Sequence, residues 1–283
     1  MPARAGCYRH PMQGTILLVG CGKMGGALLA GWFKRGLSPA DAIVVEPAGR
    51  DSVTACSDHC ALTVLPRMSD VPRDFRPDVI LFAVKPQVAD HVVPTYRSFT
   101  SQHPVFLSVL AGKPTAYFKR HLGEEAAVVR AMPNTPAAIG KAISVLYASS
   151  NASDIQRQVC ALLLSAVGEV AWIDDESHMD AVTAVSGSGP AYVFLLAECL
   201  RDAGIEAGLP PDFAAHLARA TVAGAGALLG ADTTDPGILR KNVTSPGGTT
   251  EAALNVLMGP EAMKSLLARA VAAATKRSKE LAL

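Results

Sequence analysis

A glycine-rich turn directly after a strand-like run constrains the fold of this chain more than any other feature. Residues 15–19 are apolar and β-prone, and Gly20, Gly22 and Gly25 follow at the spacing G-x-G-x-x-G before a predicted helix at residues 24–35. In such turns the first glycine allows a tight bend, the second lets the backbone approach a pyrophosphate, and the third lets helix and strand pack closely. The pattern therefore predicts a dinucleotide site with the pyrophosphate at the helix N-terminus.

Further apolar runs continue this pattern to about Asp175. Helical segments separate the strands that we predict at residues 42–45, 78–84, 104–110 and 126–132. The run at 78–84 is continuously apolar, as a sheet covered on both faces requires. Strands that alternate with helices are typical of parallel βαβ units. We therefore expect residues 15–175 to form a Rossmann-type, doubly wound α/β domain, preceded by a disordered extension at residues 1–14.

The remaining residues, 176–283, indicate helix almost throughout. Proline near the start and glycine after the end mark helices that we predict at residues 190–203, 211–229, 249–258 and 260–283. No strand is predicted after about Ile173. Apolar residues make up 49% of the chain but aromatic residues only 5%, so small aliphatic side chains are available for close helix packing. We expect an α/β fold: a Rossmann-type doubly wound sheet followed by an all-α C-terminal domain.

Composition and charge exclude several classes of partner. The net charge is +1, from 26 basic and 25 acidic residues without a basic block, so we expect no nucleic-acid partner. No apolar run reaches the length of about 20 residues that spans a membrane, and the first residues lack the apolar core of a secretory signal. Cys56 and Cys60 lack a second pair of metal ligands. We therefore expect no metal site, and a cytoplasmic protein with reduced thiols.

The end of the second predicted strand bears on the choice of cofactor. Glu46 follows Gly25 by about 20 residues, where an acid usually accepts hydrogen bonds from the ribose hydroxyls. Such a carboxylate favours NADH, because it repels the 2′-phosphate of NADPH, whereas Arg50 would offset this by pairing with that phosphate. A solvated, purely structural Glu46 stays open as well. Lys85, at the end of a central strand, either contacts the cofactor or lies on the rim, so the sequence leaves NADPH or NADH open.

Two polar, glycine-rich turns in the C-terminal half point to an anion. The segment 243–250 (VTSPGGTT) leads into an Ala/Leu helix and contains no Lys, His, Asp or Glu, so backbone N–H groups and hydroxyls would hold the ligand. The segment 186–192 (SGSGPAY) also precedes a helix; alone, Ser186 or Ser188 would be read as an N-cap. Two such turns indicate a shared anion pocket built from helix N-termini. Together with the dinucleotide turn, they predict hydride delivery to a small carboxylate substrate.

The chain resembles the pyrroline-5-carboxylate reductase family over roughly residues 15–282. The most specific motifs are those at residues 20–25 (GCGKMG), 83–86 (AVKP), 132–136 (MPNTP), 180–192 and 242–250. The resemblance implies an NAD(P)H-dependent oxidoreductase that reduces the C=N bond of 1-pyrroline-5-carboxylate to L-proline, the final step of proline biosynthesis. It also implies a homodimer with interlocking helical domains and active sites shared between subunits, often built into larger rings such as a decamer.

The same resemblance assigns site residues by matching positions. Cofactor contacts are implied for Val19, Gly20, Cys21, Gly22, Lys23, Met24, Ala83, Val84, Lys85, Pro86, Val109, Leu110, Ala111 and Asn242. Gly25, Glu46 and Arg50 join these candidates from the motif and strand-end arguments above. The substrate's carboxylate and ring are implied to contact Ser245, Gly248, Thr249 and Thr250, with Glu176 beside the ring nitrogen. Family members that use NADP often carry Ser where this chain has Glu46, and their Asn before the third strand is not evident at residues 66–69.

The expected chemistry needs few titratable groups. A cyclic imine is easily protonated, so its reduction depends on orientation more than on a strong acid, and the Thr250 hydroxyl would hydrogen-bond the ring nitrogen. A β-hydroxyacid dehydrogenase has the same layout but needs a Lys on a helix of its second domain, and this chain has no Lys between Lys141 and Lys241. A dinucleotide-binding sensor without catalytic activity is a second alternative. In such a protein we would expect the polar and glycine residues at 245–250 to be replaced, but they are all present, so the sequence disfavours it.

Overall fold

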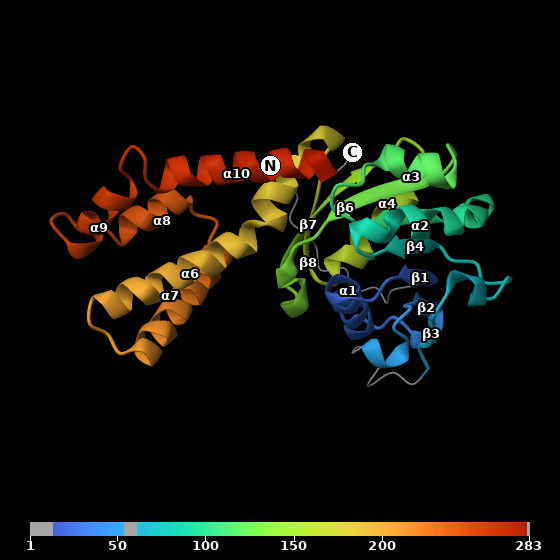
Figure 1. Ribbon diagram of the computed structural model, residues 1–283, viewed down its shortest axis with the longest axis horizontal. Helices are drawn as coiled ribbons and strands as arrows, with labels where there is room; N and C mark the ends of the chain where they lie inside the picture. The colour runs from blue at the N-terminus through green and yellow to red at the C-terminus, as the bar shows by residue number, and fades with distance from the viewer. Residues whose placement is uncertain (1–13, 54–60, 282–283) are drawn as a thin grey trace. The chain divides into compact units, whose positions relative to one another are not determined.

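The computed structural model describes residues 14–53 and 61–281 (Figure 1). Residues 1–13, 54–60 and 282–283 lie outside the described residues, and with them most of the expected N-terminal extension and the pair Cys56 and Cys60. The chain divides into two compact units. The first comprises residues 1–187 together with 276–283, and the second comprises residues 188–275.

An eight-stranded sheet forms the centre of the first unit, in the order β3-β2-β1-β4-β5-β6-β7-β8 (Figure 1). Every neighbouring pair is parallel except β6 and β7, which run antiparallel. The strands are β1 (Ile16–Val19), β2 (Ala42–Val45), β3 (Thr63–Leu65), β4 (Val79–Phe82), β5 (Val105–Ser108), β6 (Ala127–Met132), β7 (Ala142–Ala148) and β8 (Gly168–Trp172).

Helices cover both faces of this sheet, because successive side chains of a strand point to opposite sides. In β1, Ile16 and Leu18 pack in one core with α1 (Lys23–Lys34) and α4 (Asp154–Ser165). Leu17 and Val19 pack in a second core, on the other side of the sheet. The elements of that side are α2 (Ala89–Val92), the 3-10 helix η6 (Val93–Gln102) and α3 (Thr115–Leu122). The continuously apolar strands are thus buried on both faces, as predicted.

The predicted Rossmann-type fold is confirmed, but three strands were not predicted. β3 is short, and β7 and β8 extend the sheet beyond β6. β7 is antiparallel because residues 133–141, which join it to β6, are fewer than the dozen or so that a parallel crossover requires. Further short 3-10 helices connect these elements: η1 (Pro39–Asp41), η2 (Arg50–Ser52), η4 (Met68–Asp70), η5 (Pro86–Val88), η7 (Thr135–Ile139) and η8 (Glu176–His178).

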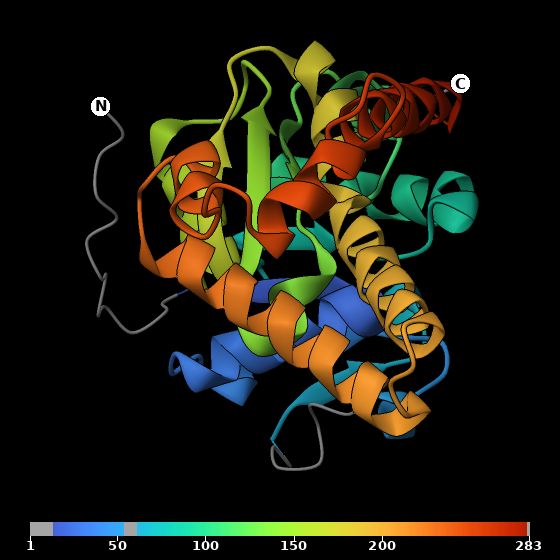
Figure 2. The same cartoon turned by 90° about the vertical axis from the view of Figure 1, so that its left-hand side faces the viewer.

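The second unit is all helical, as predicted. α6 and α7 pack side by side in it (Figure 2), and Gly204 lets them approach, because a Cβ at this position would lie 3.3 Å from the Cβ of Ala214. The described helices from residue 179 onward are α5 (Met179–Val182), α6 (Gly189–Glu206), α7 (Pro211–Ala231), α8 (Pro236–Asn242), α9 (Thr249–Leu257) and α10 (Met263–Leu281). Of these, α5 and the last turn of α10 belong to the first unit.

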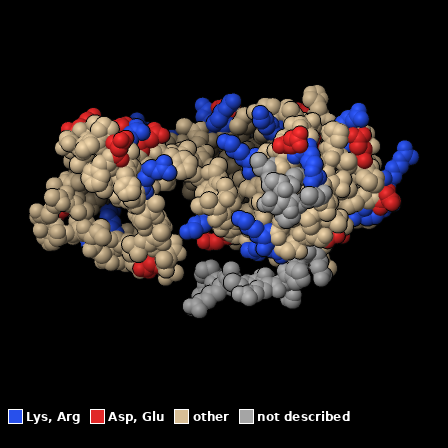
Figure 3. All heavy atoms as spheres, turned by 90° about the horizontal axis from the view of Figure 1, so that it is seen from below, with Lys and Arg blue, Asp and Glu red and all other residues tan. Residues whose placement is uncertain are grey.

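Many large apolar side chains of the second unit are exposed in the single chain. They include Val193, Phe194, Leu195, Leu228, Leu229, Val256 and Leu266. The space-filling view shows the uncharged surface of these helices as broad tan areas between scattered charges (Figure 3). So much exposed apolar surface is typical of an interface with another protein surface.

Candidate active site

The predicted dinucleotide turn connects β1 to α1 in the expected way. Gly20 has a φ of 86°, which favours glycine, and its N–H donates to the carbonyl of Val45 at 2.9 Å. Helix α1 begins at Lys23, and no side chain caps its N-terminus at Gly22. Because the first N–H groups of a helix have no partner within it, this end offers donors and a partial positive charge to an anion.

The three glycines of the turn have different spatial roles. A Cβ on Gly20 would lie 2.8 Å from Cγ1 of Val84, and a Cβ on Gly25 would lie 2.4 Å from the carbonyl oxygen of Gly20. A Cβ on Gly22 would meet no atom within 4 Å. Gly20 and Gly25 therefore permit close packing inside the protein, whereas Gly22 leaves open space of the kind that a pyrophosphate needs.

Three segments predicted to bind the cofactor meet at one edge of the sheet. β1 and β4 are neighbours, but the chain leaves β1 toward β2 and leaves β4 toward β5, so a topological switch point lies between them. The glycine turn follows β1, and Ala83–Pro86 follows β4. The N–H of Val109 donates to the carbonyl of Phe82 at 3.1 Å, which places the segment after β5 beside them. Open α/β sheets bind their ligands at such a point.

Glu46 is directed at the glycine turn. Its Oε2 accepts a hydrogen bond from the N–H of Cys21 at 2.8 Å, and its Oε1 accepts one from the N–H of Ala48 at 3.1 Å. The half-buried carboxylate thus lies where an adenosine ribose would be expected. The guanidinium of Arg50 donates to the carbonyl of Leu62, and Lys85 is exposed at the start of η5. The cofactor roles of these residues remain predictions.

The predicted substrate turn lies in the second unit and opens α9. Gly247 has a φ of 70°, and the N–H of Gly248 donates to the carbonyl of Ser245 at 3.0 Å. A Cβ on Gly248 would lie 2.6 Å from Oγ of Ser245, so only glycine leaves this hydroxyl in place. Thr249 and Thr250 form the first turn of α9, with no side chain capping it at Gly248. The turn therefore places Thr249 and Thr250 at a helix N-terminus beside Ser245, and their role in substrate binding stays a prediction.

Asn242 and Glu251 flank this turn in the sequence. Asn242 is the last residue of α8 and is exposed. Glu251, which sequence reasoning missed, accepts the N–H of Gly247 on its Oε2 at 2.8 Å and so stabilises the bend. The position of Glu251 in the sequence could have indicated this contact, because an acidic residue in the first turn of a helix favours contacts with the N–H groups there.

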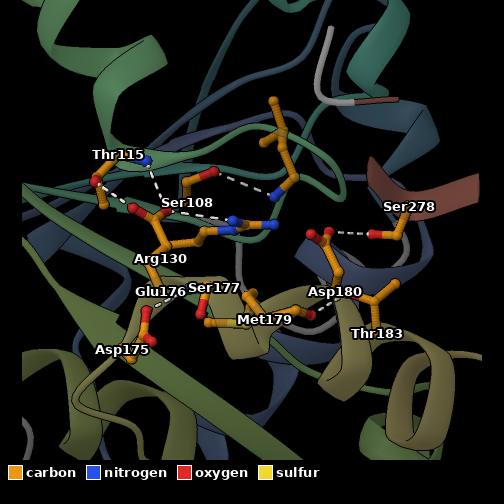
Figure 4. Close-up of polar contacts among 11 residues, drawn as sticks. Ser108, Thr115, Arg130, Asp175, Glu176, Ser177, Met179, Asp180, Thr183 and Ser278 are labelled. Carbon is orange, nitrogen blue, oxygen red and sulfur yellow. Dashed lines mark hydrogen bonds and ion pairs between the residues drawn. The ribbon is translucent and has the colours of Figure 1, made fainter. Parts of the chain in front are cut away.

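Glu176 lies in the first unit and contacts Thr115 and Arg130 there (Figure 4). Its Oε1 accepts the N–H of Thr115 at 2.8 Å and faces Nη1 of Arg130 at 3.2 Å, while its Oε2 accepts the hydroxyl of Thr115 at 2.6 Å. Next to it, the hydroxyl and N–H of Ser177 lower the pKa of the Asp175 carboxyl. The expectation that Glu176 lies beside the substrate's ring nitrogen stays a prediction.

The turn at residues 186–192 is not an open helix N-terminus, so this part of the expected anion pocket is wrong. Residues Thr183–Gly187 form a π-helix that leads into α6, and Ser188 has helical φ and ψ of −84° and −22° without a side-chain cap bond. Pro190 has no N–H for the carbonyl of Ser186, the residue four positions earlier. Nδ2 of Asn134 donates to this carbonyl instead, at 3.4 Å.

Neither a metal centre nor a membrane span is found in residues 14–53 and 61–281. Over these ranges, His, Cys, Asp and Glu side chains do not gather in groups of three or more that could hold a metal ion. Within the same part of the chain, each helix is too short or too polar to cross a membrane.

Comparison with known proteins matches a different family model to each half of the chain and finds relatives that cover nearly the whole chain. The family described as "Pyrroline-5-carboxylate reductase dimerisation" matches residues 176–281, and the family described as "NADP oxidoreductase coenzyme F420-dependent" matches residues 15–112. The chain is 38% identical to the pyrroline-5-carboxylate reductase of Pseudomonas aeruginosa over 94% of its own length and 96% of the relative's length.

Solved structures agree with these matches. A pyrroline-5-carboxylate reductase from Coxiella burnetii is similar with a TM-score of 0.85 at 31% identity, covering 95% of this chain and 99% of the other. The Plasmodium falciparum pyrroline carboxylate reductase, solved with NADP bound, is similar with a TM-score of 0.82 at 26% identity, covering 97% of this chain and all of the other. With its dinucleotide turn, its all-helical second unit and these relatives, the chain belongs to the pyrroline-5-carboxylate reductase family.

Proposed function

We infer that this chain is an NAD(P)H-dependent oxidoreductase that reduces the C=N bond of 1-pyrroline-5-carboxylate to L-proline, the final step of proline biosynthesis. Relatives of this name cover nearly the whole chain, so both domains of the family are present. The observation that carries the inference is the turn at 245–250, because it places hydroxyl-bearing residues at a helix N-terminus that could hold a carboxylate. The carboxylate of Glu251 takes the N–H of Gly247 and leaves the first N–H groups of α9 to the ligand.

The edge of the sheet at β1 and β4 suits the dinucleotide. The N-terminus of α1 and the open side of Gly22 would receive the pyrophosphate, and residues 109–111 would wall the nicotinamide. The bound cofactor supplies the hydride. The chain's own residues hold the dinucleotide in one orientation and keep the expected nicotinamide position beside the ends of β4 and β5.

We propose that the turn opening α9 binds the substrate. Ser245, Gly248 and Thr249 would hold its carboxylate through hydroxyl and N–H groups, since a helix N-terminus favours an anion. Thr250 would hydrogen-bond the ring nitrogen, and Asn242 would contact the cofactor beside it. The cyclic imine is protonated readily in water, so the site's main task is orientation, and a hydroxyl is sufficient at the nitrogen.

We propose that NADH is the preferred cofactor. The Glu46 carboxylate accepts the N–H of Cys21 and so lies beside the glycine turn, where it would bind ribose hydroxyls and repel a 2′-phosphate. Arg50 would offset this repulsion by pairing with the phosphate, but its guanidinium already donates to the carbonyl of Leu62. The family also binds NADP, as the structure of the Plasmodium falciparum relative shows for that protein.

We propose that the functional domains divide near residue 176 and that residues 176–283 form a homodimer with shared active sites. The dimerisation family matches residues 176–281, and the apolar side chains exposed on α6, α7 and α9 would be covered in such a dimer. A larger ring such as a decamer, and a cytoplasmic location with reduced thiols, are parts of the same proposal. We expect no nucleic acid as a partner, because the net charge is +1 without a basic block. We expect no membrane as a partner, because no apolar run reaches the length that spans one.

Replacing Thr250 tests the proposed substrate turn. Thr250→Ala removes the hydroxyl, and we expect kcat to fall by about 10- to 100-fold, since a positioning hydrogen bond contributes about 1–3 kcal/mol. Thr250→Ser is the matched control, because it keeps a hydroxyl at the first turn of α9, and it should retain most of the activity. Steady-state kinetics with pyrroline-5-carboxylate measure both variants. An unchanged rate in Thr250→Ala, or equal losses in the two folded variants, would contradict the role.

A further inference from the structure

Among the described residues of α10 (Met263–Leu281), only Ser278 is buried, with 4% of its surface exposed. Its hydroxyl donates to Oδ1 of Asp180, 98 positions earlier in the chain, at 2.7 Å (Figure 4). Both residues lie in the first unit, which takes in residues 276–283. A buried hydroxyl is costly unless it is hydrogen-bonded, so this bond restricts where the last turn of α10 can lie.

The hydroxyl of Thr275, one turn earlier in the same helix, makes a different kind of bond. It donates to the carbonyl of Val271, four positions earlier in its own helix, at 2.8 Å. Such a bond needs no partner outside the helix. Ser278 instead reaches α5, where Met179, next to Asp180, is fully buried. The acceptor of the Ser278 hydroxyl therefore belongs to a firmly packed part of the first unit.

The last turn of α10 also contacts Gly112. Leu281 follows Ser278 by three positions, which places the two residues on the same side of the helix. A Cβ on Gly112 would lie 3.0 Å from the Cβ of Leu281 and 3.1 Å from its carbonyl oxygen, so no side chain fits between the two segments. Gly112 also has a φ of 76°, which favours glycine. The backbone at Gly112 thus packs directly on the last turn of α10.

Gly112 directly follows residues 109–111, the proposed wall of the nicotinamide. The start of this wall is fixed by the sheet, because the N–H of Val109 donates to the carbonyl of Phe82 at 3.1 Å. Its other end adjoins Gly112, where Leu281 provides the contact. The wall is therefore supported by the sheet at one end and by α10 at the other.

We propose that Ser278 is a positioning residue for hydride transfer: by donating to Asp180 it holds the last turn of α10 against Gly112 and so keeps residues 109–111 in place beside the nicotinamide. The proposal rests on the proposed function. It adds a role within one chain to a segment that the dimerisation family model covers. Hydride transfer depends steeply on the distance and angle between the reacting carbons, so a displaced wall slows the reaction even when both ligands still bind.

Two variants and a matched control test this role. Ser278→Ala removes the buried hydroxyl, whereas the control Thr275→Ala removes a hydroxyl of the same helix that bonds its own backbone. A deletion of residues 281–283 removes the contact with Gly112 but leaves Ser278 in the chain. The measurements are kcat, the KM for the imine and for NADH, the fluorescence of NADH bound in the absence of imine, and the elution volume in size-exclusion chromatography.

The positioning role predicts a specific combination of results. In Ser278→Ala, kcat falls by about tenfold while both KM values stay within about threefold, and the emission of bound NADH shifts toward that of free NADH. The deletion has the same effect, and adding Ser278→Ala to the deletion lowers kcat no further, because both changes release the same support. Thr275→Ala changes none of these quantities. All variants elute like the wild type, which separates positioning from assembly.

Other combinations overturn the proposal. If folded Ser278→Ala has a lower Tm but unchanged kcat and NADH emission, the hydrogen bond serves stability alone. An unchanged kcat in the deletion variant refutes the route through Gly112, and a loss of kcat that accompanies a changed elution volume assigns Ser278 to assembly instead. If Ser278→Ala does not fold, the deletion decides alone. If the wild-type protein does not reduce the imine, the proposed function fails, whereas the emission of NADH bound to the variants still tests the support of the wall.

Discussion

Substituting Gly25 by alanine probes the dinucleotide turn at its tightest point. The added Cβ would lie 2.4 Å from the carbonyl oxygen of Gly20. Carbon and oxygen atoms in proteins approach to about 3.3–3.6 Å even in favourable contacts, so the turn and α1 must separate by about 1 Å. This displacement moves the N–H groups of α1 away from the pyrophosphate position that the turn defines.

The magnitude follows from the cost of overpacking. Inserting a methyl group into a tightly packed site costs about 1–3 kcal/mol. Because about 1.4 kcal/mol corresponds to a factor of ten in affinity, we expect the Kd for NADH to rise by about 10- to 100-fold if the bound state carries this cost. Thermal unfolding should shift down only by the part of this cost that remains in the free protein after α1 has moved, because a cost shared by the free and the bound protein does not change Kd.

Two neighbouring glycines are controls with different expected results. A Cβ on Gly26 would lie 3.9 Å from the carbonyl oxygen of Cys21, an ordinary contact, so Gly26→Ala should leave the Kd unchanged and stabilise α1 by up to about 1 kcal/mol. A Cβ on Gly22 would meet no protein atom, so Gly22→Ala should keep the Tm but weaken NADH binding by filling the pyrophosphate space.

Fluorescence titration with NADH and thermal unfolding of the three variants measure these effects. Wild-type affinity in Gly25→Ala would refute the reasoning from the Gly20 contact. An equal loss of affinity in Gly26→Ala would also refute it, because the distances would then have no predictive value.

Two further predictions concern cofactor preference and a buried thiol. Glu46→Gln removes the charge beside the turn, and we expect the ratio of kcat/KM for NADPH to that for NADH to rise by about tenfold or more. Two like charges about 4 Å apart repel by about 1 kcal/mol in water and about 4 kcal/mol at an effective dielectric constant of about 20. An unchanged ratio would exclude Glu46 from selectivity. Burial raises the pKa of the Cys160 thiol above its usual value of 9.0. The folded thiol therefore stays neutral at pH 8 and should resist alkylation. Its contribution to the free energy of unfolding should decline as the pH rises above 9, where the thiol of the unfolded chain ionises. Rapid labelling of Cys160 in the folded protein would contradict the expected protection by burial.

The sequence predicted the centre of the sheet well but not its edges. The predicted strands at 42–45, 78–84, 104–110 and 126–132 all contain an observed strand, because each is apolar on both faces and bounded by turn residues. β3 and β8 are edge strands with exposed or half-exposed side chains, so they lack the continuous apolar run that marks a buried parallel strand.

The misread turn at residues 186–192 has a similar local cause. Two glycines and a proline indicate a break between helices, and the local pattern carries no information about Asn134, which lies far away in the sequence. In the structure, Asn134 donates to the carbonyl that Pro190 leaves without its usual partner, and the chain continues through a π-helix. A distant hydrogen bond thus overrides the local signal.

For the candidate site, sequence patterns found the segments but not the residues that hold them. The glycine turn, Ala83–Pro86 and Val109–Ala111 meet at the edge where their strand positions predicted them. The contacts of Glu176 with Thr115 and of Asp180 with Ser278 join residues far apart in the chain, so no local period or spacing indicates them. Such contacts become visible only in three dimensions.

The most direct test of the central claim is to mix the purified protein with pyrroline-5-carboxylate and to follow the nicotinamide absorbance with NADH and with NADPH in parallel, identifying the product by mass spectrometry. The account predicts oxidation of the cofactor in step with the formation of proline, and faster oxidation of NADH. A protein that binds the dinucleotide but oxidises neither cofactor when the imine is added would contradict it.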